Sequence, residues 1–310
     1  MSATLQVPAE RLAPPRVASP RRRPRLLADA RGVYIIWYRD LLRWWRDRQR
    51  ILPSVVQPIL YLFVFGVGLG SAISGARGAG PGSGSGSGSG LSALGVSYTT
   101  FMYPGVLGMS VLFTSIFSAM SIVWDREFGF LKEIQVAPIS RAAVAIGKAL
   151  GGSSVAMLQA SLLLLVSPLV GVALDPLLVL KILGLLFLLA FALSAFGVAI
   201  ASRMRSMEGF QVVMNFVLMP ILFLSGAFFP LSGLPAWLAG LTRVDPAAYA
   251  VDALRRVVLT SAGVPDDLAS SLAFSGPSGD ALPILVEVVI LALFSVPALA
   301  LAVRWFGQQE

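Results

Sequence analysis

The chain has 310 residues, of which 56% are apolar and 13% are charged, and its formal net charge is +8. Charge-free stretches of about twenty residues can each cross roughly 30 Å of hydrocarbon, which excludes a soluble protein and predicts an all-α polytopic membrane protein. The chain has no His, no Cys and no acidic cluster with metal-binding spacing, which excludes disulfides and imidazole or thiolate catalysis, so we expect no metal site.

The first fifty residues hold twelve Arg against four acids. Residues 1–30 are rich in Pro, Ala and Arg and lack periodicity, which predicts a disordered basic cytoplasmic tail. A basic arm can also bind nucleic acid. Because this arm directly precedes membrane spans, we expect it to bind anionic membrane lipids and no nucleic acid. No apolar segment with a cleavage site follows Arg21-Arg22-Arg23 at signal-peptide distance, so we expect no secretory signal.

Residues 31–50 show a helical period that gathers aromatic side chains on one face and arginines on the other. This pattern predicts an amphipathic interfacial helix that lies flat in the headgroup region, whereas a soluble core helix would more often use Leu and Val. Ile36 and Arg48 interrupt the pattern. The residues expected to anchor the apolar face are Trp37, Leu41, Trp44 and Trp45.

A transmembrane domain is predicted over residues 51–304. It contains six spanning segments, near 51–73, 99–123, 143–171, 177–201, 212–229 and 284–303. Prolines inside the first, fifth and last segments indicate kinks, which are either gates or packing irregularities. Residues 75–90 end in a Gly-Ser repeat that predicts a flexible outer loop; a natural insertion and an engineered linker would both give this pattern.

The distribution of positive charge predicts the orientation. If the N-terminus is cytoplasmic, 19 of the 24 Lys and Arg residues fall on the cytoplasmic side. Cytoplasmic segments of membrane proteins carry such an excess, so we expect both termini inside.

The cytoplasmic stretch 124–135, between the second and third predicted spans, mixes five charges with Phe128, Phe130, Leu131 and Ile134. An ordinary solvated turn is one interpretation. The other is a short amphipathic helix that presses against a partner protein, because such a surface needs apolar anchors inside a polar rim.

The segment between the last two spans is too apolar for a free loop and too rich in proline for a simple span. It predicts two short helices that dip into the outer leaflet and join near residues 244–246; a cap that only packs the spans is the alternative. Asp252 is expected to pair with Arg255 or Arg256 at helical spacing. The candidate residues of this outer cap are Pro230, Pro235, Trp237, Asp245, Tyr249, Asp252 and Arg255.

Signs of enzymatic chemistry are weak. The sequence contains neither a G-x-x-x-x-G-K-[ST] phosphate loop nor a G-x-S-x-G nucleophile elbow. Lys148 and Lys181 lie near serines, but they flank spans, where lysine usually anchors to headgroups. Glu287 is the main carboxylate within a span. It could line a pathway, but we favour a position that faces outer-surface water. We therefore predict a protein without its own ATPase site or other motor.

Three stretches carry a resemblance to a known family. They are Asp125-Arg126-Glu127-Phe128-Gly129-Phe130-Leu131-Lys132-Glu133 with Ala137-Pro138-Ile139-Ser140-Arg141, then Phe223–Leu231 with Leu234–Leu238, and Asp245-Pro246 with Tyr249–Arg255. Together they resemble the membrane subunit of ABC type-2 exporters, the bacterial permeases of the daunorubicin-resistance and nodulation-factor kind. The chain departs from this family in its longer basic tail, its Gly-Ser loop and Ala247-Ala248, where the family often has Leu-Thr.

The resemblance implies a bacterial cell-membrane permease that pairs with a second permease, identical or related, and with two cytoplasmic ATPase subunits that bind ATP and Mg²⁺. It also implies that the stretch after the second span is a coupling helix, with the interfacial helix beside it, and that the substrate route is lined by the first, second and fifth spans. The residues then expected to contact the ATPase are Asp125, Arg126, Glu127, Phe128, Phe130, Leu131 and Glu133.

The function predicted in this way is outward export of an amphipathic drug-like molecule, lipid or glycolipid at the expense of ATP. An ion-coupled secondary carrier and a non-transporting membrane scaffold for a cytoplasmic partner are the alternatives.

Overall fold

The computed structural model describes residues 25–75, 97–128, 139–229, 231, 234–272 and 282–308, and every regular element within them is a helix. The predicted tail up to residue 24 and the predicted Gly/Ser loop from residue 76 onward lie outside these residues. In chain order the elements are α1 Arg25–Arg46, α2 Arg48–Gly75, α4 Tyr98–Ser118, α5 Met120–Glu127, α7 Arg141–Leu164, the 3₁₀ turn η2 Ser167–Val170, α8 Pro176–Arg203, α9 Met207–Leu224, α10 Ala236–Thr242, α11 Pro246–Ser261, α12 Asp266–Ser271 and α13 Ile284–Gly307.

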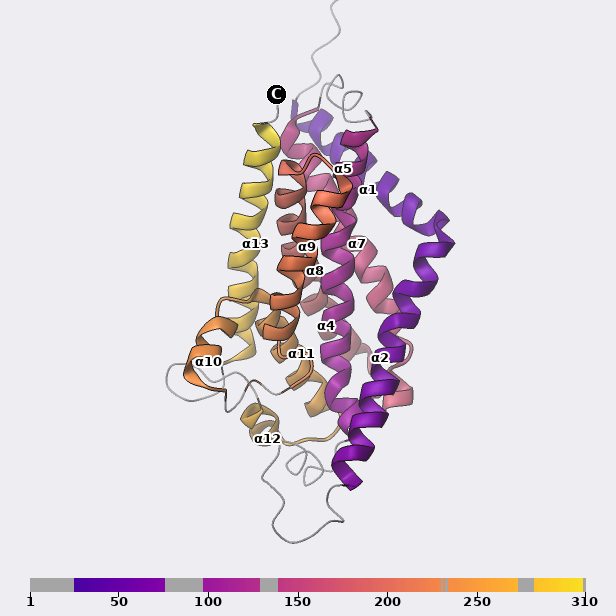
Figure 1. The fold of residues 1–310 in the computed structure, drawn as a ribbon, viewed down its shortest axis with the longest axis vertical. Coiled ribbons are helices and arrows are strands. Elements are labelled where there is room, and N and C mark those ends of the chain that lie inside the picture. Colours follow the sequence, from indigo (N-terminus) through magenta and orange to yellow (C-terminus); the bar gives the residue numbers. More distant parts are fainter. Residues whose placement is uncertain are drawn as a thin grey trace, which may run out of the picture.

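The long helices form one bundle with two distinct ends (Figure 1). Helix α1, helix α5 and the C-terminus lie at one end, which we call the α1 end. Helices α10 and α12 lie at the other, the α12 end. Helices α2, α7 and α9 run from the α1 end toward the α12 end, and α4, α8 and α13 return.

Five helices among the described residues are long and apolar enough to cross a membrane, within Ile51–Gly68, Tyr98–Glu127, Pro176–Arg203, Met207–Leu224 and Ile284–Gly307. Helix α7, which covers most of the predicted third span, is not one of them. It ends at Leu164 rather than near residue 171, and it carries Arg141, Lys148 and several Gly and Ser. The chain is therefore a multi-pass membrane protein with five helices that qualify by composition.

Helix α7 nevertheless runs beside α4 over most of the bundle's length. Near the α12 end, the Tyr103 hydroxyl donates to the Leu163 carbonyl at 3.1 Å. Near the α1 end, the Lys148 ammonium donates to the Ser121 hydroxyl at 2.9 Å. Helix α7 has a modest hydropathy because α1, rather than lipid, covers part of its surface. Small residues of α7, such as Gly147 and Gly151, allow this close packing.

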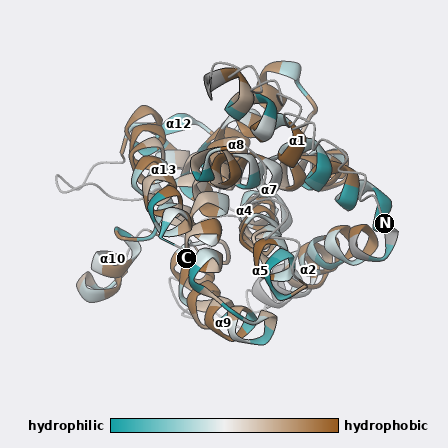
Figure 2. Ribbon diagram, turned by 90° about the horizontal axis from the view of Figure 1, so that it is seen from above, coloured by the Kyte–Doolittle hydropathy of each residue, from teal (hydrophilic) through white to brown (hydrophobic). Residues whose placement is uncertain are grey.

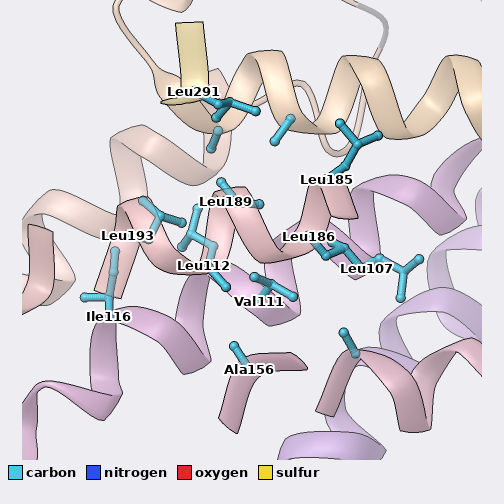
Figure 3. Packing of buried hydrophobic residues seen from close by; sticks show 14 of the residues in the cluster. Leu107, Val111, Leu112, Ile116, Ala156, Leu185, Leu186, Leu189, Leu193 and Leu291 are labelled. Atoms are coloured by element: carbon cyan, nitrogen blue, oxygen red, sulfur yellow. The ribbon is translucent and has the colours of Figure 1, made fainter. Parts of the chain in front are cut away.

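The centre of the bundle is built by α4 and α8. Two thirds of the apolar window in α4–α5 (67%) and half of that in α8 are buried, against 17% in α2 and 22% in α9 and α13. Seen along the bundle axis (Figure 2), α4 lies among the other long helices. Figure 3 shows the packed aliphatic side chains, which are Leu107, Val111, Leu112 and Ile116 of α4, Leu185, Leu186, Leu189 and Leu193 of α8, Ala156 of α7 and Leu291 of α13.

Proline shapes the first span. Pro58 has no N–H, so the Ser54 carbonyl loses its partner within the helix. The side chain of Gln159, which is 2% exposed, donates to this carbonyl from α7 at 2.8 Å. Thr114 of α4 in turn donates to the Gln159 amide oxygen. One buried amide therefore satisfies a proline defect and joins three helices, as backbone groups inside a membrane require.

The segment between α9 and α13 forms helices at the α12 end (Figure 1), and their dipping into the outer leaflet stays a prediction. Helices α10 and α11 are two short helices joined near Asp245, and Asp245 caps α11 by accepting from the Ala247 N–H at 2.9 Å. Gly105 of α4 packs against the turn before α10, since a Cβ there would lie 2.1 Å from the Ala227 carbonyl oxygen. Only glycine fits at such a distance.

Candidate functional site

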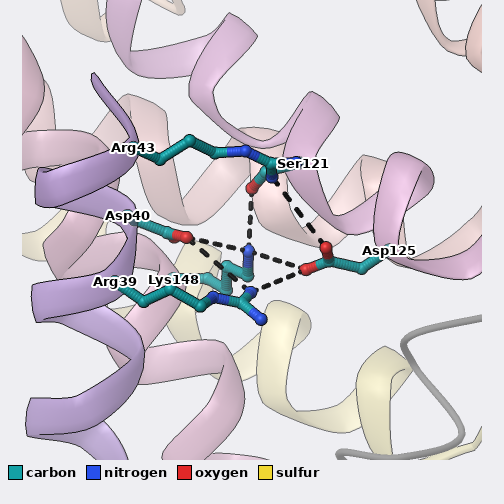
Figure 4. A network of polar contacts seen from close by, with 6 residues as sticks. All are labelled: Arg39, Asp40, Arg43, Ser121, Asp125 and Lys148. Carbon is teal, nitrogen blue, oxygen red and sulfur yellow. Dashed lines mark hydrogen bonds and ion pairs between the residues drawn. The ribbon is translucent and has the colours of Figure 1, made fainter. Parts of the chain in front are cut away.

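A buried ion-pair network joins α1, α5 and α7 at the α1 end (Figure 4). The Lys148 ammonium lies 3.1 Å from an Asp125 carboxylate oxygen and 3.2 Å from Asp40. Arg39 donates to Asp125 at 2.8 Å. The side chains of Lys148 and Asp125 are 3% and 5% exposed, so the lysine does not reach the headgroups, and the sequence-based expectation for it was wrong.

Burying this network is feasible because its members satisfy one another. An unpaired buried charge costs several kcal/mol, so each ion of the network stabilises the fold only while its partners are present. Gly151 allows the approach of α1 to α7, because a Cβ there would lie 3.1 Å from the Asp40 side chain. The network therefore fixes the position of α1 at the point where the predicted coupling stretch begins.

The next two residues tie α5 to the ends of two other helices. Arg126 donates to the carbonyls of Ser202, at 2.9 Å, and Met204, at the C-terminal end of α8. Glu127 accepts from the Met207 N–H at 3.2 Å, at the N-terminus of α9. Each charge has the sign that the helix end favours, since C-terminal carbonyls attract cations and N-terminal N–H groups attract anions.

Two aromatic residues at the same place face outward. Trp124 and Phe128 are 41% and 57% exposed, and their ring centroids lie 4.9 Å apart. Of the residues predicted to contact an ATPase, Asp125 is buried and Arg126 is partly buried, whereas Glu127 and Phe128 are exposed. Glu127 is engaged with α9, so Phe128 offers the exposed apolar side chain. Phe130, Leu131 and Glu133 lie outside the described residues.

Helix α1 presents two opposite faces. Ile36 and Trp44, each 6% exposed, face the bundle, and the Trp37 indole N–H donates to the Ser154 hydroxyl of α7 at 2.8 Å. Ile36 interrupted the predicted pattern because its face packs on the glycines of α7. The exposed face carries Tyr34, Tyr38 and Trp45, with the half-buried Leu41 beside them. The aromatic set predicted for one face is therefore divided between the two.

A second charged cluster at the α12 end includes Asp252, one of the candidate cap residues. Arg256 lies 3.5 Å from Asp252, which confirms the pairing predicted at helical spacing, and 2.5 Å from Glu287. Glu287 is fully buried, so the expectation that it faces outer-surface water was wrong; its countercharge comes from α11, far away in sequence. Arg255 donates to the Gly226 carbonyl and lies over the Phe101 ring, 4.3 Å from its centroid.

The other predicted cap residues are spread over this end. Tyr249 donates to the Arg243 carbonyl at 2.8 Å, which holds α11 to the turn after α10. Pro235 caps the N-terminus of α10, while Trp237 is 69% exposed. Pro230 lies outside the described residues. The cap residues thus do not converge on one site.

Sequence comparison relates the chain to transport permeases. A family described as ABC-2 type transporter matches residues 31–259. Nodulation protein J of Rhizobium leguminosarum is 24% identical over 227 residues, which cover 72% of this chain and 81% of that protein. A protein of Cyanophora paradoxa named as the transport permease ycf38 is 30% identical over 167 residues, which cover 53% of this chain and 58% of that protein.

A further relative of Escherichia coli K12 is named as a multidrug ABC transporter permease, YbhR. It is 26% identical over 176 residues, which cover 54% of this chain and 46% of YbhR. The aligned part of this chain therefore spans about half of the length of the Cyanophora and E. coli relatives.

Proposed function

Because the chain belongs to the ABC-2 type transporter family, we propose that it is the membrane permease of an ATP-driven exporter. ATP and Mg²⁺ bind to a separate cytoplasmic ATPase subunit, and this chain carries no catalytic residue. The exported molecule is amphipathic, of the drug-like, lipid or glycolipid class. The name of the E. coli relative as a multidrug permease supports this class.

The observation that carries the proposal is the combination of exposure and anchoring around residue 126. Trp124 and Phe128 offer an outward aromatic pair, as a docking surface needs. The three charged residues between them connect α5 to α1, α7, α8 and α9. A push on this surface therefore moves several long helices together, which is how ATP-driven closure of a partner would reach the transport path.

The proposed orientation puts the α1 end in the cytoplasm of a bacterial cell membrane. The excess of Lys and Arg on that side supports it. The exposed aromatic face of α1, opposite the face that packs on α7, then lies among anionic headgroups.

We also propose that two permeases pair within the exporter. Helix α9 supports this, because its outward residues Val212, Phe216 and Phe223 are 70%, 81% and 58% exposed, and a second permease or lipid must cover them.

The first experiment tests the docking surface. The chain is purified from its native membrane, and co-purifying ATPase and ATP hydrolysis in liposomes are measured for Phe128→Ala and for Trp45→Ala. Trp45 is a matched control, because it is also an aromatic residue at the α1 end and is 68% exposed. It lies on the face of α1 that points away from α7. We expect Phe128→Ala to weaken assembly about tenfold, since one buried aromatic anchor contributes roughly 1–2 kcal/mol, and Trp45→Ala to leave it unchanged.

Equal assembly of the two variants would contradict the docking surface. If no ATPase accompanies the unmodified chain and an ion gradient alone drives transport, the exporter proposal itself fails.

A further inference from the structure

Two cavities meet at Trp44. The first, of about 360 Å³, lies between α1, α5 and α7 and is lined by Arg43, Ser121 and Trp124 among others. The second, of about 340 Å³, lies between α2, α4 and α7 and is lined by Tyr61, Phe113 and Gln159 among others. Trp44 lines both. Each volume is in the range of sites for small molecules, about 300–1,000 Å³.

The two cavities lie at different depths along the bundle. The first is beside Trp124, in the last turn of α5, and the second is beside Thr114, ten residues earlier on the same span. At about 1.5 Å per residue these points are about 15 Å apart, which is half of a hydrocarbon core of roughly 30 Å. A molecule that fills both cavities would extend from the headgroup level into the acyl chains of one leaflet.

The first cavity continues into a shallow hollow whose free charge is positive. This hollow, of about 610 Å³, shares Arg43 and Asp47 with it and adds Arg46. Asp125 and Asp40 are engaged by Lys148, and Asp47 already has a partner in the chain. Arg43 is 51% exposed and reaches Asp125 only at 3.9 Å. Arg46 has no ion pair among the described residues.

The second cavity offers mainly hydrocarbon and aromatic surface. The partly buried Thr114 donates to the buried Gln159, and Gln159 donates to the Ser54 carbonyl. The buried Ser110 donates to the Leu107 carbonyl of its own helix. Phe113 and Phe117 lie parallel to each other beside them, with centroids 6.4 Å apart. A hydrocarbon chain can fill such a space without leaving a protein donor unpaired, whereas a second polar head would have to break existing bonds.

We propose that these cavities form one binding site for a phosphate-headed amphiphile drawn from the leaflet at the α1 end. Arg43 and Arg46 bind the phosphate, because one guanidinium group can donate two parallel hydrogen bonds to phosphate oxygens. Trp44 packs against the junction of head and tail, and the tail enters the space between α2, α4 and α7. That this amphiphile is the exported molecule rests on the proposed export function; the binding site does not.

The test compares two lipids with identical acyl chains, phosphatidylglycerol and diacylglycerol, which differ in the phosphate head. Binding to the purified full chain is measured by native mass spectrometry. We expect the unmodified chain to bind phosphatidylglycerol at least tenfold more tightly. Changing both Arg43 and Arg46 to Gln should remove this preference, since the loss of one charge-assisted hydrogen bond corresponds to about tenfold.

Two further variants complete the experiment. Arg31→Gln is the matched control, because Arg31 is an exposed arginine of α1 that lines neither the two cavities nor the shallow hollow. It should leave the preference for phosphatidylglycerol unchanged. Gln57→Trp fills the second cavity from an exposed position and should weaken the binding of both lipids about equally. Equal effects of Arg31→Gln and the double change, or unaltered binding by Gln57→Trp, would overturn the site.

A further measurement on the complex with its ATPase in liposomes asks whether the amphiphile is cargo or a resident lipid. The lipid that stays bound is measured before and after ATP is added. Loss of the bound lipid on ATP addition identifies it as cargo, and retention identifies a resident membrane lipid. A chain that has no ATPase partner but keeps the phosphate preference would refute the exporter proposal alone.

Discussion

At the scale of single residues, Asp245 is held in a place that disfavours its charge. The residue is 5% exposed, and one carboxylate oxygen accepts from the Ala247 N–H while the other has no hydrogen-bond partner among the described residues. Burial raises the pKa of Asp245 to about 7, although the backbone hydrogen bond partly opposes this. Below about pH 7 the folded protein therefore favours the protonated acid in the helix cap.

This shift predicts how stability depends on pH. An unfolded Asp has a pKa of about 3.9, so between about pH 4 and 7 the folded chain binds the additional proton and its free energy of unfolding falls as pH rises. We expect the thermal midpoint in detergent to be lower at pH 8 than at pH 5. The contribution of Asp245 is at most about 4 kcal/mol, at about 1.4 kcal/mol per pKa unit.

Asp245→Asn should flatten this dependence, because its amide oxygen still caps α11 and carries no charge. Asp266→Asn is the control, since Asp266 is exposed and begins α12 at the same end. An unchanged slope in Asp245→Asn would show that the raised pKa is not the cause.

At the scale of elements, Gln159 links α7 to α2 by a side-chain hydrogen bond. Gln159→Leu keeps the volume but leaves the Ser54 carbonyl, freed by Pro58, without a donor. We expect it to destabilise the chain by about 1–2 kcal/mol, the range found for polar contacts between helices of model membrane peptides. Thermal unfolding in detergent gives the total effect, and hydrogen exchange along α2 locates it.

Gln57→Leu supplies the comparison. Gln57 is a glutamine of α2 that lines the second cavity, but it is exposed, and its side chain donates to Tyr61 of the same helix at 3.4 Å. It should change the midpoint little, and an equal loss in both variants would contradict the role given to Gln159.

The sequence predicted the elements better than their contacts. Charge-free length gave the helices that match five of the predicted spans, and helical spacing gave the pairing of Asp252 with Arg256. Helical spacing carries no information on partners that lie on other helices. Lys148 was therefore assigned to headgroups although it meets Asp40, and Glu287 was assigned to water although it meets Arg256. The composition of α7 also conceals that it runs the length of α4, because its surface is adapted to other helices rather than to lipid.

At the scale of the whole molecule, the lack of cysteine makes the topology directly testable. Phe128 and Glu208 lie at the α1 end, since their neighbours Glu127 and Met207 are in contact. Asp175, just before α8, and Asp266, the first residue of α12, lie at the α12 end (Figure 1). If α7 crosses the membrane, single cysteines at Phe128 and Glu208 react with an impermeant maleimide from one side. Those at Asp175 and Asp266 then react from the other side.

The informative pair is Phe128 and Asp175, which flank α7. Labelling of both from the same side would mean that α7 does not cross, and the chain would have five spans. Because α8 lies between Asp175 and Glu208, those two must label from opposite sides in either case, which serves as an internal control.

The ion pair of Arg256 with Glu287 has a consequence for synthesis. Glu287 is in the first turn of the last helix, and its countercharge is on α11, thirty residues earlier. A carboxylate enters a bilayer at considerable cost when it is alone. Because α11 leaves the ribosome before α13, the arginine is already present when the glutamate arrives. Membrane insertion of α13 therefore depends on prior synthesis of α11. The order of translation ensures that Arg256 can neutralise Glu287 as soon as the glutamate enters the membrane.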